Sequence, residues 1–195
     1  MRLPILLSTL SLLPIALSAP TTSPNTCPTT IIKDGGFESG TTPPTSGGNA
    51  WTVIGFLGSS TYALTSPGST KAGGKYAFTS ILYPDPYSPT SGETLTQTLS
   101  TCAGKNYSIT ADYKFDDAAS GNCAISINYP YKTTRGSVTT GSAISPAGVW
   151  YTTGATFQAV SSADRLDIVF SCNNRANDKI SVDNVKIAPF NGNAF

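Results

Sequence analysis

A strict alternation of apolar and polar residues is the feature of this sequence that most constrains its fold. In the stretch 107–116 every second residue is apolar and the residues between them are polar. The apolar positions are Tyr107, Ile109, Ala111, Tyr113 and Phe115. A period of two is typical of a β-strand with one face in a core and the other in water. The stretches 123–129 and 166–172 alternate in the same way.

Six more stretches are predicted to be strands, because each is bounded by turn residues. They are 31–38, 51–56, 75–82, 94–100, 151–158 and 180–187. In the last one, Ile180 and Val182 share one phase of the alternation, whereas Val185 and Ile187 share the other. A phase change within a strand predicts a β-bulge, here at 183–184.

The number and length of these stretches predict the fold class. About nine short strands, with no helical period after the first twenty residues, indicate an all-β protein. We expect an antiparallel two-sheet sandwich of the jelly-roll type. No internal repeat or linker divides 31–190, so this range is predicted to be a single domain.

The first eighteen residues have the pattern of a signal peptide. Arg2 precedes an apolar stretch, 3–17, that is shorter than a membrane-spanning helix requires. The small residues Ala16 and Ser18 favour cleavage after Ser18, and an uncleaved anchor is the alternative. Residues 19–30 then form a short leader. We therefore expect a protein secreted to the extracellular space or the cell wall.

Composition limits the classes of partner. Charged residues make up 12% of the chain and the formal net charge is +1. Nucleic acids and anionic membranes favour clustered Lys and Arg, so neither is an expected partner. A weakly charged surface rich in hydroxyls and amides suits a neutral, hydroxyl-rich ligand, or equally an inert extracellular domain.

Catalysis is not expected. The chain has no histidine, which excludes Ser-His-Asp and Cys-His nucleophiles and imidazole metal sites. Glu38 and Glu93 are the only glutamates. Asp112 and Asp116 would lie about 13 Å apart along one strand, which exceeds both glycosidase geometries. An aspartate from a neighbouring strand is the remaining way to build a carboxyl pair.

Four cysteines predict two disulfides in an oxidising compartment. They are Cys27, Cys102, Cys123 and Cys172, and their spacing fits no zinc site. Three pairings are open, of which we favour Cys102–Cys172 with Cys27–Cys123. The Asn-Tyr-Ser sequon predicts a glycoprotein with its glycan on Asn106.

Several segments, taken in order, resemble a known pattern. They are 34–40 (DGGFESG), Trp51, 73–78, 95–99, 104–109, Trp150, 156–157 and 180–185. In order and spacing they resemble the galactose-binding-like jelly roll of carbohydrate-binding module families four and nine. The closer resemblance is to small secreted fungal proteins that carry this domain alone. It covers nearly the whole mature chain and implies the fold more strongly than the function. Trp51 and Trp150 match tryptophans that pack in the interior.

The resemblance also implies a structural calcium ion between the first strand and the last. The matching positions are Glu38 and Asp183. Calcium takes about six to eight oxygen ligands, and backbone carbonyls of Gly35, Gly36 and 69–71 could add to the carboxylates. The alternative is that Glu38 caps a turn and Asp183 bonds the backbone at the bulge.

Glycan-binding members of this family stack aromatic rings on sugars and bond the hydroxyls with amides. The candidate ligand-binding residues here are Tyr83, Tyr87, Gln97, Asp112, Tyr129 and Tyr131. Each has a structural alternative. Tyr129 continues the core face of its strand, Tyr83 and Tyr87 could cover the rim, and Asp112 could be solvated. Gln97 lies in phase with apolar residues, so its amide needs a backbone or a ligand partner.

Two functional hypotheses follow. The first is a non-catalytic secreted module that binds cell-wall or extracellular polysaccharide by aromatic stacking and hydrogen bonding. The second is a structural or interaction protein, adhesion- or effector-like, that keeps the jelly roll without sugar binding. Its partner would be another secreted protein.

Overall fold

A computed structural model describes residues 27–43, 51–57, 59–83, 90–116, 123–129, 137–141, 146–173 and 178–192. The predicted signal peptide and most of the leader lie outside these ranges. Within them, no helix has the length and apolar character needed to span a membrane.

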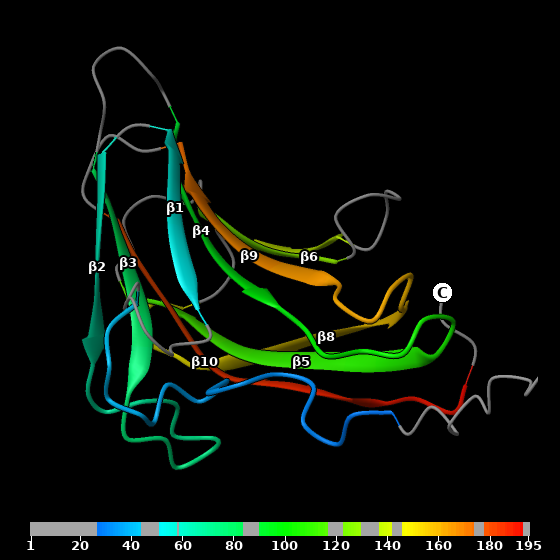
Figure 1. The fold of residues 1–195 in the computed structure, drawn as a ribbon. Coiled ribbons are helices and arrows are strands. Elements are labelled where there is room, and N and C mark those ends of the chain that lie inside the picture. The colour runs from blue at the N-terminus through cyan, green and yellow to red at the C-terminus, as the bar shows by residue number, and fades with distance from the viewer. Residues whose placement is uncertain are drawn as a thin grey trace, which may run out of the picture.

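The architecture is an antiparallel sandwich of two five-stranded sheets (Figure 1). The strands are β1 Thr52–Leu57, β2 Ser59–Thr65, β3 Ala77–Tyr83, β4 Ser91–Thr98, β5 Asn106–Phe115, β6 Cys123–Asn128, β7 Ser137–Gly141, β8 Tyr151–Gln158, β9 Arg165–Cys172 and β10 Asp178–Pro189. Sheet A has the order β1-β4-β9-β6-β7, and sheet B has the order β2-β3-β10-β5-β8. The predicted all-β, two-sheet fold is confirmed.

The core lies between the sheets and is built from the inward positions of the alternating strands. Figure 1 shows β9 and β6 stacked over β5, and their apolar residues meet in this layer. Trp51 is 2% exposed and stacks on Phe37 with ring centroids 5.7 Å apart. Trp150 is also buried, beneath the Lys114 ammonium group. Trp51 therefore packs in the interior, as predicted, whereas Trp150 is buried without belonging to the core between the sheets.

The bulge in β10 is confirmed and one predicted strand is corrected. The pairing of β10 with β5 shifts register after Asp183, and Asn184 has a positive φ of 51°. The stretch 31–38 is not a strand but a series of turns, with Asp34 and Phe37 at φ of 47° and 56°. Such left-handed residues cannot continue an extended strand. The stretches 59–65 and 137–141, which were not predicted, are strands.

The segment that replaces the predicted first strand closes one edge of the sandwich. The Ile31 carbonyl accepts from Ser100 N–H after β4, and the Gly35 carbonyl accepts from Val185 N–H in β10. A Cβ on Gly35 would lie 2.0 Å from the Val185 carbonyl oxygen, so only glycine allows this approach. The segment therefore bridges the two sheets.

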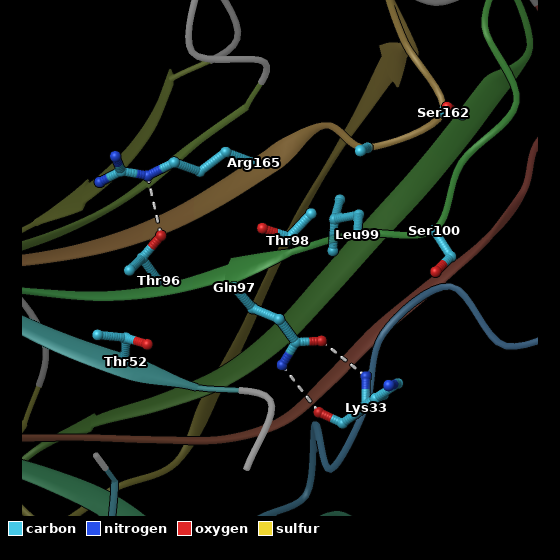
Figure 2. Close-up of a pocket in the computed structure, with 10 residues that line it drawn as sticks. Lys33, Thr52, Thr96, Gln97, Thr98, Leu99, Ser100, Ser162 and Arg165 are labelled. Carbon is cyan, nitrogen blue, oxygen red and sulfur yellow. Dashed lines mark hydrogen bonds between the residues drawn. The ribbon is translucent and has the colours of Figure 1, made fainter. Parts of the chain in front are cut away.

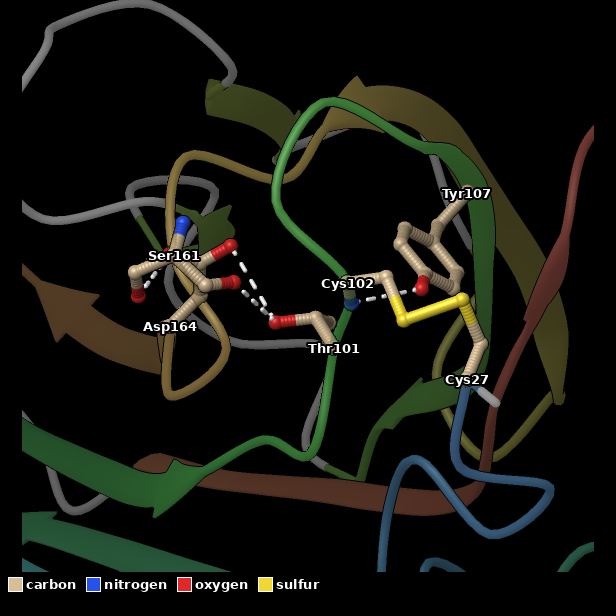
Figure 3. Close-up of a disulfide and its surroundings, with 6 residues drawn as sticks. All are labelled: Cys27, Thr101, Cys102, Tyr107, Ser161 and Asp164. Atoms are coloured by element: carbon tan, nitrogen blue, oxygen red, sulfur yellow. Dashed lines mark hydrogen bonds between the residues drawn. A yellow bond between two sulfur atoms is a disulfide. The ribbon is translucent and has the colours of Figure 1, made fainter. Parts of the chain in front are cut away.

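The favoured disulfide pairing is wrong. The structure pairs Cys123 with Cys172, which lie opposite one another on the neighbouring strands β6 and β9. The second disulfide joins Cys27 to Cys102 (Figure 3). It ties the N-terminal segment to the loop after β4, where the Cys102 N–H also donates to the Tyr107 hydroxyl at 2.9 Å.

Candidate functional site

The outward face of sheet A is a curved, largely polar surface. Figure 1 shows β4, β9 and β6 bending together, with the face that points away from sheet B on the inside of the bend. One row across this face consists of Thr52, Thr96, Asp167 and Asn128, which are in register on β1, β4, β9 and β6. We call this surface the concave face. Its polar rows follow from the outward phase of the same alternation that builds the core.

A pocket of about 590 Å³ opens at the end of the concave face where β4 ends and β9 begins (Figure 2). Its lining residues are Lys33, Thr52, Thr96, Gln97, Thr98, Leu99, Ser100, Ser162, Ala163 and Arg165. Five of them carry hydroxyls, and two carry positive charge. The volume falls within the range of roughly 300–1,000 Å³ that is usual for small-ligand pockets.

Arg165 is held across the concave face by its neighbours. Its Nε donates to Thr96 Oγ1 at 2.9 Å and to Asp167 Oδ1 at 2.6 Å. Thr96 Oγ1 in turn donates to the Leu166 carbonyl at 3.1 Å. Because a charge-assisted pair of this kind orients the guanidinium, the pocket wall on this side is preorganised.

Gln97 holds the opposite wall. Its side chain is 3% exposed and forms two hydrogen bonds with the backbone of Lys33. The Lys33 N–H donates to Gln97 Oε1 at 2.7 Å, and Gln97 Nε2 donates to the Lys33 carbonyl at 2.9 Å. The sequence predicted that this amide bonds either the backbone or a ligand, and the structure shows that it bonds the backbone. We call this pair of bonds the Gln97 clamp.

The third wall is the turn between β8 and β9, which Asp164 organises. Its buried carboxylate accepts from Ser161 N–H at 3.0 Å and from Val160 N–H at 3.1 Å. In Figure 3 the Thr101 hydroxyl donates to the Ser161 carbonyl at 2.8 Å, and the Asp164 carboxylate lies beside this carbonyl, 3.4 Å from the hydroxyl. The turn is therefore fixed to the loop after β4, next to the Cys27–Cys102 disulfide.

Three carboxylates gather at a different place, where 34–38, the loop 68–75 and the bulge of β10 meet. We call Glu38, Asp112 and Asp183 the acidic cluster. Asp183 and Asp112 are each 1% exposed, whereas Glu38 is exposed. Ser69 joins the two aspartates: its N–H donates to Asp183 at 2.6 Å and its hydroxyl donates to Asp112 at 2.8 Å. Lys75 N–H donates to Glu38 at 2.7 Å.

The electrostatics of the acidic cluster are unfavourable for three anions. Burial raises the pKa of Asp183, hydrogen bonds from Ser69 and Asn184 N–H oppose this shift, and the charges of Glu38 and Asp112 add to it. The ion pairs among the described residues are Lys114–Asp116 and Arg165–Asp167, so neither involves the cluster.

Gly74 lies where two of these carboxylates converge. A Cβ at this position would be 2.5 Å from Asp183 Oδ2 and 3.2 Å from Glu38 Oε1. Any other residue would push the two oxygens apart, so glycine is required here. Both oxygens also accept backbone N–H bonds, Asp183 Oδ2 from Ser69 and Glu38 Oε1 from Lys75, as the structural alternative for these two residues predicts. Carboxylate oxygens are also the ligands that a hard divalent cation such as calcium prefers.

The predicted ligand residues do not form one surface. Tyr83 is half-buried at the end of β3, and its hydroxyl bonds to Thr61 at 3.0 Å. Tyr129 is 7% exposed, packs on Phe157 and donates to the Thr156 carbonyl, so its structural alternative, a core residue, is the one observed. Asp112 belongs to the acidic cluster, where it has no access to a large ligand. Tyr87 and Tyr131 lie outside the described residues.

Two other sites remain to be placed: the predicted glycosylation site and a candidate metal-binding group next to the β6–β9 disulfide. Asn106 is half-buried, and its Nδ2 donates to the Gly192 carbonyl at 2.7 Å; its glycosylation stays a prediction. Cys123, Cys172 and Asp178 have ligand-type atoms within 4.8 Å of one another. Because the two sulfurs are joined in a disulfide, they cannot act as thiolate metal ligands.

The pocket itself was not predicted, although the sequence held part of the signal. Thr94, Thr96 and Thr98 alternate with inward residues along β4, and they mark a hydroxyl row on an outward face. Lys33 and Arg165 carried no such signal. Both line the pocket because Gln97 bonds the backbone of Lys33, and because Arg165 lies opposite Thr98 in the pairing of β9 with β4.

Comparison with known proteins supports the fold. TmCBM61 in complex with β-1,4-galactotriose superposes with a TM-score of 0.55 at 20% identity, over 83% of this chain and 99% of that chain. A structure of carbohydrate-binding modules with promiscuous specificity from the β-sandwich superfamily gives 0.58 at 12% identity, over 82% and 63%. A putative sugar-binding protein from Bacteroides thetaiotaomicron gives 0.53 at 12% identity, over 83% and 100%. Protein-family models and curated protein sequences give no match.

Proposed function

We propose that this chain is a non-catalytic carbohydrate-binding module whose glycan lies along the concave face and ends in the pocket. The observation that carries the proposal is the threonine-lined pocket at the end of a curved polar sheet face. Hydroxyl rows and an oriented guanidinium match the closely spaced hydroxyls of a sugar ring. The similarity to carbohydrate-binding modules agrees with this use of the fold.

Binding in the pocket would consist of hydrogen bonds and van der Waals contacts, with no covalent step. Thr52 and Thr98 are exposed, and Thr96 is held by Arg165. Preformed walls reduce the ordering cost of binding, since the Gln97 clamp and the Asp164 turn fix the backbone on two sides. We expect affinities between millimolar and micromolar for short oligosaccharides, or about −4 to −8 kcal/mol.

The test removes hydroxyls from the pocket without changing its shape. Thr52→Val with Thr98→Val keeps β-branched side chains and loses two hydroxyl groups. Thr61→Val with Thr110→Val makes the same change on exposed positions of sheet B and serves as the control. Binding is measured on insoluble chitin, cellulose, xylan, β-glucan and galactan, and by calorimetry with soluble fragments.

We expect at least one glycan to bind the unchanged protein and the control equally, and to bind the pocket variant about tenfold more weakly. Failure of the unchanged protein to bind any of these glycans would favour the alternative, a secreted structural or interaction protein. If the pocket variant and the control bind the glycan equally well, the glycan binds somewhere other than the pocket.

We also infer that the protein is exported and works outside the cell. Two disulfides are compatible with an oxidising, extracellular environment. The signal-like residues 1–18 support the same inference. Detection of the mature chain, beginning after Ser18, in culture medium would test it.

A structural calcium ion at the acidic cluster is a second proposal. The residues fit such an ion: Glu38 and Asp183 would hold it through side-chain oxygens, and no described cation pairs with either. When bound, calcium would supply positive charge that offsets the repulsion among the carboxylates. The ion would link Glu38 in the 34–38 turns to Asp183 at the bulge of β10, away from the concave face.

Thermal unfolding with calcium and with a chelator tests this proposal. At a hundredfold excess over its Kd, calcium would add about 2.7 kcal/mol, or roughly 5–10 °C in melting temperature. Asp183→Asn should abolish the difference, whereas Asp116→Asn, outside the cluster, should keep it. A chelator that leaves the melting temperature of the unchanged protein as it was would contradict the proposal.

A further inference from the structure

The pocket differs from the rest of the concave face in its charge. Two of its lining residues, Lys33 and Arg165, are cations, and none is an anion. Arg165 is paired with Asp167, but Lys33 is exposed and forms no ion pair among the described residues. The pocket therefore carries a net positive charge in a chain whose total is only +1.

The Gln97 clamp explains how Lys33 comes to line the pocket. Both bonds of the clamp go to the Lys33 backbone, which leaves its side chain out of the clamp. A glutamine in the inward phase of β4 gains nothing from burial unless its amide is bonded. Its role here is to position a cationic residue at the open end of a sheet face.

We propose that this pocket is a subsite for a uronic acid residue, so that the glycan recognised is an acidic or uronate-decorated polysaccharide. The inference rests on the proposed function and narrows it. The threonine and serine hydroxyls would meet the ring hydroxyls, as for a neutral sugar. The positive charge of Lys33 would meet the carboxylate, because charge-assisted hydrogen bonds are stronger than neutral ones. Arg165, on the opposite wall of the pocket, would add to the positive potential there.

The experiment compares sugars that differ in one carboxylate. D-glucuronate and D-galacturonate are titrated by NMR beside D-glucose and D-galactose, and glucuronoxylan fragments are compared with the same fragments after carboxyl reduction. The unchanged protein should bind each acid about fivefold more tightly than its neutral partner. Raising the ionic strength should weaken this preference and leave neutral binding unchanged.

Lys33→Met should remove most of the preference for the acid, and Lys33→Arg should keep it. The substitution spares the clamp, which uses only backbone atoms of this residue. Lys186→Met, on an exposed position of β10, is the matched control and should behave like the unchanged protein.

The outcomes separate the two proposals. If neutral glycans bind at the pocket but acids bind no more tightly, the uronate subsite is wrong and the carbohydrate-binding function stands. If no glycan binds, acidic or neutral, both are overturned. A preference for acids that survives Lys33→Met would also overturn the subsite, since its charge would then come from elsewhere.

Discussion

Replacing Gln97 with leucine should destabilise the protein by an amount that the clamp predicts. The variant loses two hydrogen bonds, at 2.7 and 2.9 Å, from a side chain that is 3% exposed. Each bond contributes about 1 kcal/mol net. Lys33 is exposed, so water can reach its freed backbone groups and no large desolvation penalty is added. We therefore expect a loss of about 2 kcal/mol.

For a chain of 195 residues this loss corresponds to roughly 4–8 °C in melting temperature. Urea unfolding provides the measurement: the midpoint should fall while the m-value stays unchanged. Gln158→Leu is the matched control, because Gln158 is exposed and forms one bond, at 3.2 Å, to the Gly104 carbonyl. The control should change stability by less than about 0.5 kcal/mol.

The same variant tests the link between the clamp and the pocket. With the clamp removed, the Lys33 segment keeps the Ile31–Ser100 bond but loses its nearest anchor. Glycan affinity should therefore fall in Gln97→Leu and not in Gln158→Leu. Equal unfolding midpoints for the unchanged protein and Gln97→Leu would refute the reasoning, because they would mean that the two bonds add no net stability.

Two further predictions concern the interior. Glu93 is 1% exposed, and burial raises its pKa above the ordinary 4.5, against the hydrogen bonds from Ser80 and Ser60. As pH rises, the unfolded chain releases the Glu93 proton before the folded protein does. The free energy of unfolding should therefore fall as pH rises from 4.5 through the raised pKa. Urea unfolding at a series of pH values measures this slope, and Glu93→Gln should flatten it. Cys123→Ser with Cys172→Ser opens a link of sequence separation 49 and should cost about 4 kcal/mol in the same assay. A loss below about 1 kcal/mol would contradict this estimate, because it would mean that the disulfide restricts the unfolded chain far less than its loop length implies.

Much of the fold could be predicted because alternation is a local signal. The inward phase of 107–115 and 166–172 gives buried residues in both strands. The bulge in β10 could be predicted for the same reason, since a phase change cannot be absorbed by a regular ladder. β7 escaped prediction because its sequence, SVTTG, has only one apolar residue.

The stretch 31–38 shows where local signals fail. Ile31 and Phe37 are buried, as a strand pattern would require, yet the backbone between them turns. The cause is a contact with a distant part of the chain: the Gly35 carbonyl bonds Val185 N–H, and Gly35 lies against the Val185 carbonyl. The disulfide pairing failed for a related reason, because it depends on which strands are neighbours rather than on how each strand alternates.

Besides the threonine row of β4, the sequence held one further signal of the candidate site, an inconsistency in the pattern of that strand. A glutamine among the inward residues of β4 violates the pattern of the strand, and such violations mark places where a buried polar group has a specific partner. Here the partner is the backbone of Lys33, and the consequence is a lysine at the mouth of a hydroxyl-lined pocket.

Of the tyrosines predicted to bind sugar, Tyr129 lies in the core and Tyr83 is half-buried at the end of β3, with its hydroxyl bonded to Thr61. Tyr87 and Tyr131 lie outside the described ranges. Gln97, which departs from the alternation of its strand, therefore lies in the wall of the pocket. Tyr129, which follows the alternation of its strand, lies in the core.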